Sequence, residues 1–335
     1  MSLLDTIRFF RSRRECERRN REILSDPEIH PKIGLVLNLE FHLANRWVSA
    51  ITPFLIDGLI RELRCIVIGN QTQYEDCKEN LDAVISTEVG WSAPPLRYVT
   101  KKPILKYIFV SDPHRSPQER QQFISENGFA YLLAYYYHPT LVQFAQTPAE
   151  NIVHFPWAIP DEFVNGHPIR DRGREQILVF GGSRSDAYEF RNWCREFEFA
   201  EDVRYSGVEN KALSDSKYFR WLQTFDAAVA AGSLDPKYRL VVPKYFEIAA
   251  TGCLLFAQEA EDLDLLGFQD GKNCVVINRE NYEEKARAYL RDRHSYLSIR
   301  ENGRNLILER HTVSRRIEFL RNQILGNLRQ VSLRG

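Results

Sequence analysis

The sequence lacks a net charge, because its 335 residues carry 45 lysines and arginines against 45 aspartates and glutamates. A general nucleic-acid-binding protein is expected to have a strongly basic face or a pI above about 9. Long apolar runs are missing as well. The longest stretch without a charged residue, residues 128–149, contains Pro139 and several polar groups, so we do not expect it to span a membrane. Nucleic-acid binding and membrane insertion are therefore both disfavoured.

Cysteine is scarce and scattered. The six cysteines form no C-x-x-C pair, and several lie inside apolar segments. We interpret them as reduced packing residues of a cytoplasmic protein. Asp5 and a run of arginines stand where a secretory signal would have its apolar core, so we expect no such signal.

Cofactor-binding motifs are also missing. A dinucleotide-binding domain would place G-x-G-x-x-G between its first strand and helix, whereas Gly34 stands alone in its predicted strand. No P-loop motif occurs, and no group of His, Cys or carboxylate residues has metal-ligand spacing. We therefore predict no bound cofactor and no metal.

Apolar strands alternate with amphipathic helices along most of the chain, whose length suits two domains. This alternation predicts parallel, doubly wound sheets of the α/β class. A segment rich in proline, glycine and charge, residues 156–175, marks the boundary between the domains. Strands are predicted at residues 33–39, 65–69, 83–86, 108–111, 131–135, 151–155, 177–180, 203–206, 225–231, 253–256 and 274–278.

Residues 238–256 combine a helix with a buried strand. Pro243 suits a first helical turn, where its missing N–H costs nothing, so the helix is predicted to begin at residue 242 or 243. Gly252 then ends it. Lys244 and Glu247 share one face, and a lysine at a helix start favours an anion, first of all a phosphate. The alternative is a surface Lys–Glu pair on an ordinary helix.

The strand at residues 177–180 runs into a glycine-rich turn. Gly181 and Gly182 would let the backbone approach a ligand closely, and Arg184 beyond Ser183 could hold phosphate oxygens with its two-pronged guanidinium. The alternative is a plain turn before a helix.

These segments resemble one family. A basic residue, two further residues, a glutamate and a small-residue helix that ends in glycine before a buried strand resemble the C-terminal domain of group 1-like glycosyltransferases of GT-B fold. The likeness is nearest to the spore-maturation-protein glycosyltransferase branch, and it extends over roughly residues 175–320. It also includes residues 179–183 with Tyr188 and Arg191, residues 263–271 and 274–278, and residues 309–312 with Arg315.

The resemblance implies two facing Rossmann-like domains with a cleft between them. Residues 1–30 would be a basic helical appendage, 31–160 the acceptor-side domain, 161–312 the donor domain, and 313–335 a helix that returns to the first domain. It further implies that a sugar is transferred, without a metal, from a nucleotide-sugar donor such as a UDP- or GDP-sugar. The acceptor would be a glycan, a lipid-linked molecule or a small molecule.

The resemblance also assigns roles to residues. Lys244, Arg184 and the backbone near residues 240–242 would neutralise the leaving diphosphate, while Glu247 would accept hydrogen bonds from the ribose hydroxyls. With His114 these make up the predicted catalytic set. Many family members carry a second glutamate where Arg239 stands, so retention or inversion stays open. The predicted donor-binding residues are Gly181, Gly182, Ser183, Tyr238, Arg239, Leu240, Val241 and Val242.

Polar residues that follow two strands of the first domain are candidates for the acceptor side, since ligands bind beyond the carboxyl ends of parallel strands. Glu40 and His42 follow the first strand, and Asp112, His114 and Arg115 follow the strand at residues 108–111. His42, Asp112 or His114 could act as a general base. The alternative is that they are loop residues and helix caps, with Asp112 beginning a helix at Pro113.

Two other functions stay open at this point. An epimerase-like GT-B enzyme would use the same donor site without an acceptor, and a non-catalytic relative would bind no nucleotide.

The basic N-terminal segment has two interpretations of its own. Its seven arginines between residues 8 and 21 could rest on an anionic membrane, or the helix could pack on the body of the protein.

Overall fold

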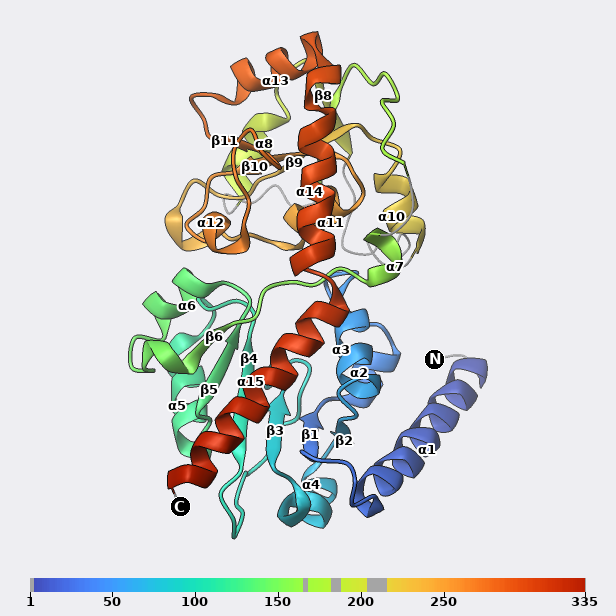
Figure 1. The fold of residues 1–335 in the computed structure, drawn as a ribbon, viewed down its shortest axis with the longest axis vertical. Helices are drawn as coiled ribbons and strands as arrows, with labels where there is room; N and C mark the ends of the chain where they lie inside the picture. Colours follow the sequence, from blue (N-terminus) through green and yellow to red (C-terminus); the bar gives the residue numbers. More distant parts are fainter. Residues whose placement is uncertain (1–2, 165–167, 182–187, 204–215, 335) are drawn as a thin grey trace. The chain divides into compact units, whose positions relative to one another are not determined.

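The computed structural model describes residues 3–164, 168–181, 188–203 and 216–334 (Figure 1). The chain divides into two compact units. The first consists of Met1–Trp47, Leu55–Phe155 and Ile317–Gly335, and the second of Val48–Phe54 and Pro156–Arg316.

The first unit is built on a six-stranded parallel sheet of order β2-β1-β3-β4-β5-β6. Its strands are short and almost fully buried, as expected when helical crossovers cover both faces of a parallel sheet. The order reverses between β1 and β3, and in sheets of this kind ligands bind at the carboxyl ends of the strands that flank such a reversal. The strands are β1 (Ile33–Val36), β2 (Ile66–Ile68), β3 (Ala83–Ser86), β4 (Leu105–Val110), β5 (Tyr131–Ala134) and β6 (Ile152–His154).

Helices alternate with these strands. The first unit contains α1 (Leu3–Ser25), α2 (Leu39–Leu43), α4 (Gln71–Cys77), α5 (Pro117–Asn127) and α6 (Tyr137–Gln143), together with most of α3 (Thr52–Arg61) and of α15 (Val313–Arg334). The last of these packs on the sheet, because the side-chain amide of Asn327 donates to the Tyr107 hydroxyl at 2.8 Å.

The second half of α1 packs on β2. The guanidinium of Arg19 donates to the carbonyl oxygens of Ile60 and Cys65, and the side chain of Asn20 bonds both the N–H and the C=O of Val67. These bonds favour the packed interpretation for this half of the helix. Over the described ranges, no helix is both long and apolar enough to cross a membrane.

The second unit has a five-stranded parallel sheet of order β11-β10-β9-β7-β8. Its strands are β7 (Ile177–Phe180), β8 (Ala200–Val203), β9 (Ala227–Ala230), β10 (Leu254–Gln258) and β11 (Val275–Ile277). Its helices are α7 (Asp161–Val164), α8 (Glu189–Cys194), α10 (Ser216–Leu222), α11 (Pro243–Ala250), α12 (Leu263–Leu266), α13 (Tyr282–Arg291) and α14 (Leu297–Arg310), with a 3-10 turn, η4 (Pro236–Tyr238). Each unit thus has a parallel sheet whose strands alternate with helices, which confirms the predicted α/β fold class.

One strand begins earlier than predicted, and one alternative is wrong. The strand expected at residues 203–206 begins at Ala200 and is described as far as Val203, while residues 204–206 lie outside the described residues. It is a half-buried edge strand whose Glu201 and Asp202 form ion pairs with Arg174 and Arg195, so it lacks the apolar run that marks a buried strand. In the first unit no helix starts at Pro113, since α5 begins at Pro117.

Candidate functional site

The site is centred on the first turn of α11. The helix begins at Pro243, after an extended Val242 with φ −71° and ψ 167°. It is followed by Gly252, which adopts a left-handed φ of +73°. The predicted start and end of this helix are thus confirmed, and both follow from the backbone preferences of proline and glycine.

Lys244 reaches from this turn to the carboxyl end of β7. Its Nζ donates to the carbonyl oxygen of Phe180 at 2.7 Å and lies 4.4 Å from the centre of the Phe180 ring. The chain therefore holds the ammonium group beside Gly181, the first residue after the strand.

Gly181 leaves a space into which two cations project. Its φ is +127°, and a Cβ placed on it would lie 2.6 Å from the Nζ of Lys244 and 2.9 Å from Nη1 of Arg191. Arg191 is 5% exposed and lies over the ring of Tyr188, 3.9 Å from the ring centre. Lys244 and Arg191 thus place positive charge around one backbone position.

A third cation supports the same turn. Arg195 donates to the carbonyl oxygen of Gly181 and forms an ion pair of 2.8 Å with Asp202. Sequence reasoning did not assign Arg195 to the site. Its signal was weak, because a lone arginine on a helix is more often a surface residue.

Burial, and secondarily the neighbouring cations, change the acidity of Lys244. Burial lowers the pKa of Lys244 to about 7, and the charges of Arg191 and Arg195 act in the same direction, while Glu247 opposes them. An anion that binds between these cations would raise the pKa again, since opposite charge favours the ammonium form.

Glu247 lies one turn further along α11, where it is 4% exposed. The hydroxyl of Tyr218, from α10, donates to its Oε2 at 2.6 Å. Burial raises the pKa of Glu247 to about 7, against the opposing effects of this hydrogen bond and of Lys244. A buried carboxyl group of this kind is suited to accept hydrogen bonds from a hydroxylated ligand.

The loop after β9 contacts the site through Arg191, whose backbone N–H donates to the carbonyl oxygen of Gly232 at 3.2 Å. Gln258, at the end of β10, accepts from the N–H of Gly232 at 2.7 Å and donates to the carbonyl oxygen of Ser233 at 2.6 Å. This buried amide fixes the turn between neighbouring strands. Sequence reasoning missed Gln258 too, because the pairing of β9 with β10 brings these residues together.

The predicted donor-binding residues before α11 have mixed surroundings. Val241 is buried, and Leu240 accepts a hydrogen bond from the N–H of Val242 at 2.9 Å. Arg239 donates to the carbonyl oxygen of Leu234 at 2.8 Å and lies 3.6 Å from the carboxylate of Glu259. Tyr238 ends η4 with its ring 5.2 Å from the Nζ of Lys237. Gly182, Ser183 and Arg184 lie outside the described residues.

In the first unit, both ring nitrogens of His42 are engaged. Trp47 donates to Nδ1 at 3.1 Å, and Nε2 lies 3.1 Å from Oδ1 of Asp57. A neutral ring that accepts at Nδ1 must carry its proton at Nε2, where it donates to the carboxylate. This arrangement leaves no lone pair of His42 for a substrate proton.

Asp112, His114 and Arg115 share a turn after β4. The carbonyl oxygen of Asp112 accepts from the N–H of Arg115 at 3.0 Å, and the guanidinium of Arg115 lies over the exposed ring of Trp91, 5.0 Å from its centre. His114 is half-buried in the same turn. The neighbouring Glu88, which sequence reasoning did not select, accepts from the Ser111 hydroxyl and pairs with Arg120 at 2.9 Å.

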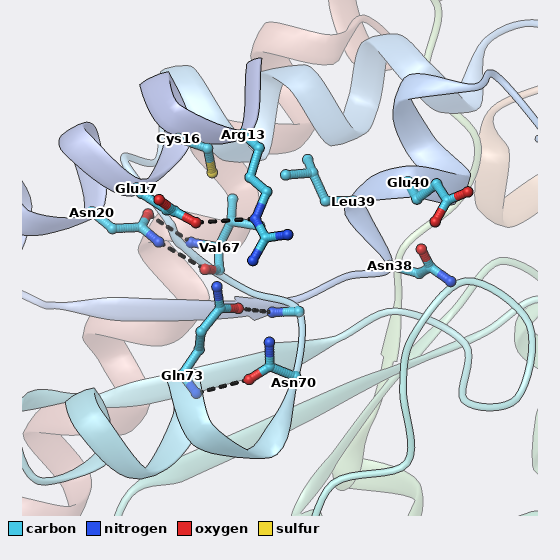
Figure 2. Close-up of a pocket in the computed structure, with 11 residues that line it drawn as sticks. Arg13, Cys16, Glu17, Asn20, Asn38, Leu39, Glu40, Val67, Asn70 and Gln73 are labelled. Atoms are coloured by element: carbon cyan, nitrogen blue, oxygen red, sulfur yellow. Dashed lines mark hydrogen bonds and ion pairs between the residues drawn. The ribbon is translucent and has the colours of Figure 1, made fainter. Parts of the chain in front are cut away.

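Glu40 lines a cavity of about 170 Å³ at the carboxyl ends of β1 and β2 (Figure 2). Asn38 and Asn70 cap the helices that follow these strands, and Gln73 accepts from the N–H of Gly69 at 2.7 Å. Arg13 of α1 points into the same space. Most of the residues that line the cavity are polar. Asp112, His114 and Arg115 are not among them.

A metal site has no support in the described part of the chain. Among those residues, no three or more His, Cys, Asp or Glu side chains gather closely enough to hold a metal ion.

Comparison with known proteins bears on this geometry. A family model described as glycosyl transferase-like matches residues 167–322, a range that contains the whole arrangement around Lys244. Among solved structures, Anabaena Alr3699/HepE in complex with UDP and glucose is similar, with a TM-score of 0.52, 11% identity, and coverage of 80% of this chain and 88% of that one. The fold is of the GT-B class.

Two further structures are similar. Sucrose-phosphate synthase from Thermosynechococcus elongatus has a TM-score of 0.52 at 9% identity, over 79% of this chain and 77% of that chain. TarM has a TM-score of 0.48 at 12% identity. The similarity covers 72% of this chain but 54% of TarM, so this chain spans about half the length of TarM. No curated protein gave a significant match. At identities this low, structural similarity shows the fold alone. The matched family model supports a glycosyltransferase.

Proposed function

We propose that this protein transfers a sugar from a nucleotide-sugar donor, with the donor bound around the first turn of α11. The observation that carries the proposal is the convergence of Lys244 and Arg191 on Gly181, one helical turn from the buried Glu247. Two cations beside a glycine suit a diphosphate, and a buried carboxyl group suits a diol.

The diphosphate is the leaving group of such a transfer, so its developing negative charge must be stabilised. Lys244 and Arg191 would supply that charge from fixed positions, without a metal ion. The N–H groups at the start of α11 would add their partial positive charge. Arg184 stays a prediction for the same role.

The ribose hydroxyls would bind Glu247. In its ionised form this carboxylate offers acceptor sites besides the one that Tyr218 occupies, and a charge-assisted bond to a hydroxyl group is stronger than a neutral one. The donor we favour is a UDP-sugar, since the structurally similar HepE was solved with UDP and with UDP and glucose.

The acceptor would bind to the first unit, near the carboxyl ends of β1, β3 and β4. The exposed ring of Trp91 beside Arg115, and the polar cavity beside Glu40, offer an aromatic face and hydrogen-bonding groups. These features suit a hydroxylated acceptor such as a glycan. His42 is a poor candidate for the base because both of its nitrogens are engaged. His114 and Asp112 stay as candidates.

The spore-maturation-protein branch stays our assignment within the superfamily, and a cytoplasmic location with peripheral membrane contact through residues 1–21 stays a prediction. The function itself is tested by calorimetric titration of the purified protein with UDP, GDP, ADP and dTDP. We expect either UDP or GDP to bind much more tightly than the other three nucleotides. A protein that binds none of the four would overturn the proposed donor site.

A further inference from the structure

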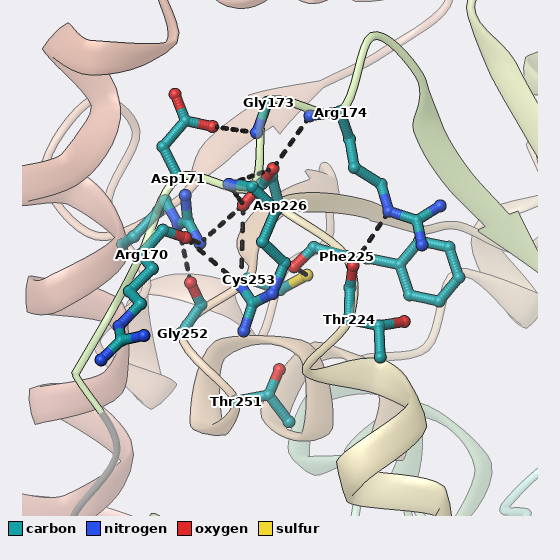
Figure 3. A network of polar contacts seen from close by, with 12 residues as sticks. Arg170, Asp171, Gly173, Arg174, Thr224, Phe225, Asp226, Thr251, Gly252 and Cys253 are labelled. Atoms are coloured by element: carbon teal, nitrogen blue, oxygen red, sulfur yellow. Dashed lines mark hydrogen bonds and ion pairs between the residues drawn. The ribbon is translucent and has the colours of Figure 1, made fainter.

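A second cavity lies in the same unit as the donor site, but at the opposite ends of the strands. It encloses about 300 Å³, and its lining includes Arg170, Arg172 and Arg300. Asp226, which binds two of these arginines, directly precedes β9, and Cys253 directly precedes β10 (Figure 3). The cavity is therefore at the amino ends of these strands, whereas Lys244 lies at the carboxyl end of β7 in the same parallel sheet.

The charges around this cavity do not balance. Among the described residues that line it, none is acidic and three are arginines. Arg172 and Arg300 share one carboxylate, Asp226, at 3.7 Å and 3.3 Å. Asp226 also accepts from the backbone N–H of Arg172 at 2.9 Å and of Arg174 at 3.2 Å. A second carboxylate, Asp171, is also near Arg300, but it lies 3.6 Å from Arg293, a further cation. The arginines of this network therefore outnumber its carboxylates, and the lining has an excess of positive charge.

Two of the arginines are held in place by the protein. Arg300 is 2% exposed, and it donates to the carbonyl oxygens of Gly252 at 2.7 Å and of Arg170 at 3.1 Å. Arg172 donates to the same carbonyl oxygen of Arg170 at 3.3 Å. Guanidinium groups that are already ordered lose little entropy when they bind a ligand.

The side chain of Arg170 differs from these two. Figure 3 shows it directed away from Asp226. Among the described residues, the hydrogen bonds of Arg170 are those that its backbone carbonyl oxygen accepts from Arg172 and Arg300. It is exposed, and it lines the cavity together with the polar side chains of Gln223 and Thr251. The described part of the lining thus has one exposed, unpaired cation, Arg170, and two ordered ones, Arg172 and Arg300.

We propose that this cavity is a binding site for a phosphorylated small molecule, separate from the donor site. A phosphoryl group offers three acceptor oxygens and up to two charges, which suits several guanidinium groups better than a single carboxylate does. The volume is at the lower end for small-molecule sites, so a phosphate ester or a diphosphate fits better than a large nucleotide sugar.

Calorimetric titration with pyrophosphate tests this proposal on the full chain. The double variant Arg170→Gln/Arg172→Gln removes two of the cations and keeps the backbone N–H groups that bind Asp226. Each lost charge-assisted contact should weaken pyrophosphate binding roughly tenfold or more. Arg291→Gln is the matched control, because Arg291 is an exposed arginine outside the cavity lining.

Lys244→Ala separates this site from the proposed donor site. We expect the parent to show a pyrophosphate site that Lys244→Ala retains and the double variant loses. If the donor site is wrong, this second site still binds. Should the double variant unfold, Arg170→Gln alone gives the test. Equal pyrophosphate binding by the parent, Arg291→Gln and the arginine variants would overturn the proposal, as would equally tight binding of malonate, which carries two carboxylates and no phosphorus.

Discussion

The hydroxyl of Tyr218 lies 2.6 Å from Oε2 of Glu247, which makes the buried carboxyl group of α11 dependent on a residue from another helix. The bond favours the ionised carboxylate, and it acts against burial, which raises the pKa of Glu247 to about 7. The ionised carboxylate depends on this donor more than the neutral carboxyl group does. The contribution of this hydrogen bond to the free energy of unfolding should therefore depend on pH.

Tyr218→Phe should therefore destabilise the protein more at pH 8 than at pH 6. Above pH 7 the variant leaves a buried carboxylate without its donor, which should cost about 1–3 kcal/mol. Below pH 7 Glu247 is protonated and the loss is smaller. Urea unfolding at the two pH values measures both free energies, and an equal loss at pH 6 and pH 8 would show that Glu247 does not ionise in this range.

Glu247→Gln should weaken the binding of UDP more than that of its 2′-deoxy analogue. The substitution keeps the size of the side chain but removes the charge that strengthens a hydrogen bond from a ribose hydroxyl. Titration of both nucleotides against the parent and the variant gives the comparison. Equal losses for the two nucleotides would indicate that Glu247 has a structural role.

Binding of a diphosphate above pH 7 should be accompanied by proton uptake. Lys244 has its pKa lowered to about 7, so at pH 8 most of it is neutral in the unliganded protein, and a bound diphosphate would return it to the charged form. Calorimetry in buffers with different ionisation enthalpies counts the protons. We expect uptake at pH 8, and an affinity that falls as the pH rises from 7 to 9.

Lys244→Arg provides the control for this proton uptake, since a guanidinium stays charged throughout that range. Proton uptake that persists in Lys244→Arg would assign the linked proton to another group.

Gly181→Ala should weaken UDP binding by roughly tenfold or more. The new methyl group would meet the Nζ of Lys244 at 2.6 Å and displace it, and the backbone φ of +127° is unfavourable for alanine. Gly271→Ala is the matched control, because Gly271 also has a positive φ, of +69°, but has open space around it. UDP binding by Gly181→Ala as tight as that of the control would remove Gly181 from the site.

Much of α11 could be predicted from the sequence, because Pro243, Lys244, Glu247 and Gly252 act through local backbone preferences and helical spacing. The rest of the site could not. Arg191 was named only through the family resemblance, without a role. Tyr218, Arg195 and Gln258 come from other elements, and only the strand order β10-β9-β7 brings those elements to the same end of the sheet. An order of this kind is set by which faces pack together, and no single segment encodes it.

The last helix, α15, also differs in part from what its sequence pattern predicts. Helical spacing predicts a buried stripe that includes Ile317, Phe319, Leu320 and Ile324. Ile317, Leu320 and Ile324 are at most 1% exposed, whereas Phe319 is 40% exposed although its ring lies near that of Phe155. Phe319 precedes Leu320 on the helix and so falls outside the stripe, at its border.

Ile324→Ala should destabilise the first unit by about 2–5 kcal/mol, the usual effect of a large cavity in a core. Val331→Ala in the same helix should have little effect, since Val331 is 46% exposed. Denaturant unfolding of both variants measures the difference. Similar stabilities would show that α15 is not anchored through its buried stripe.

The central claim is that Lys244 binds the diphosphate of a nucleotide, and UDP titration of Lys244→Ala tests it most directly. Lys272→Ala is the matched control, because Lys272 is exposed in the turn between α12 and β11. Loss of one charge-assisted contact should cost about 1.5–3 kcal/mol, so we predict roughly 10- to 150-fold weaker binding for Lys244→Ala and parent-like binding for Lys272→Ala. A folded Lys244→Ala that binds UDP as tightly as the parent would contradict the account.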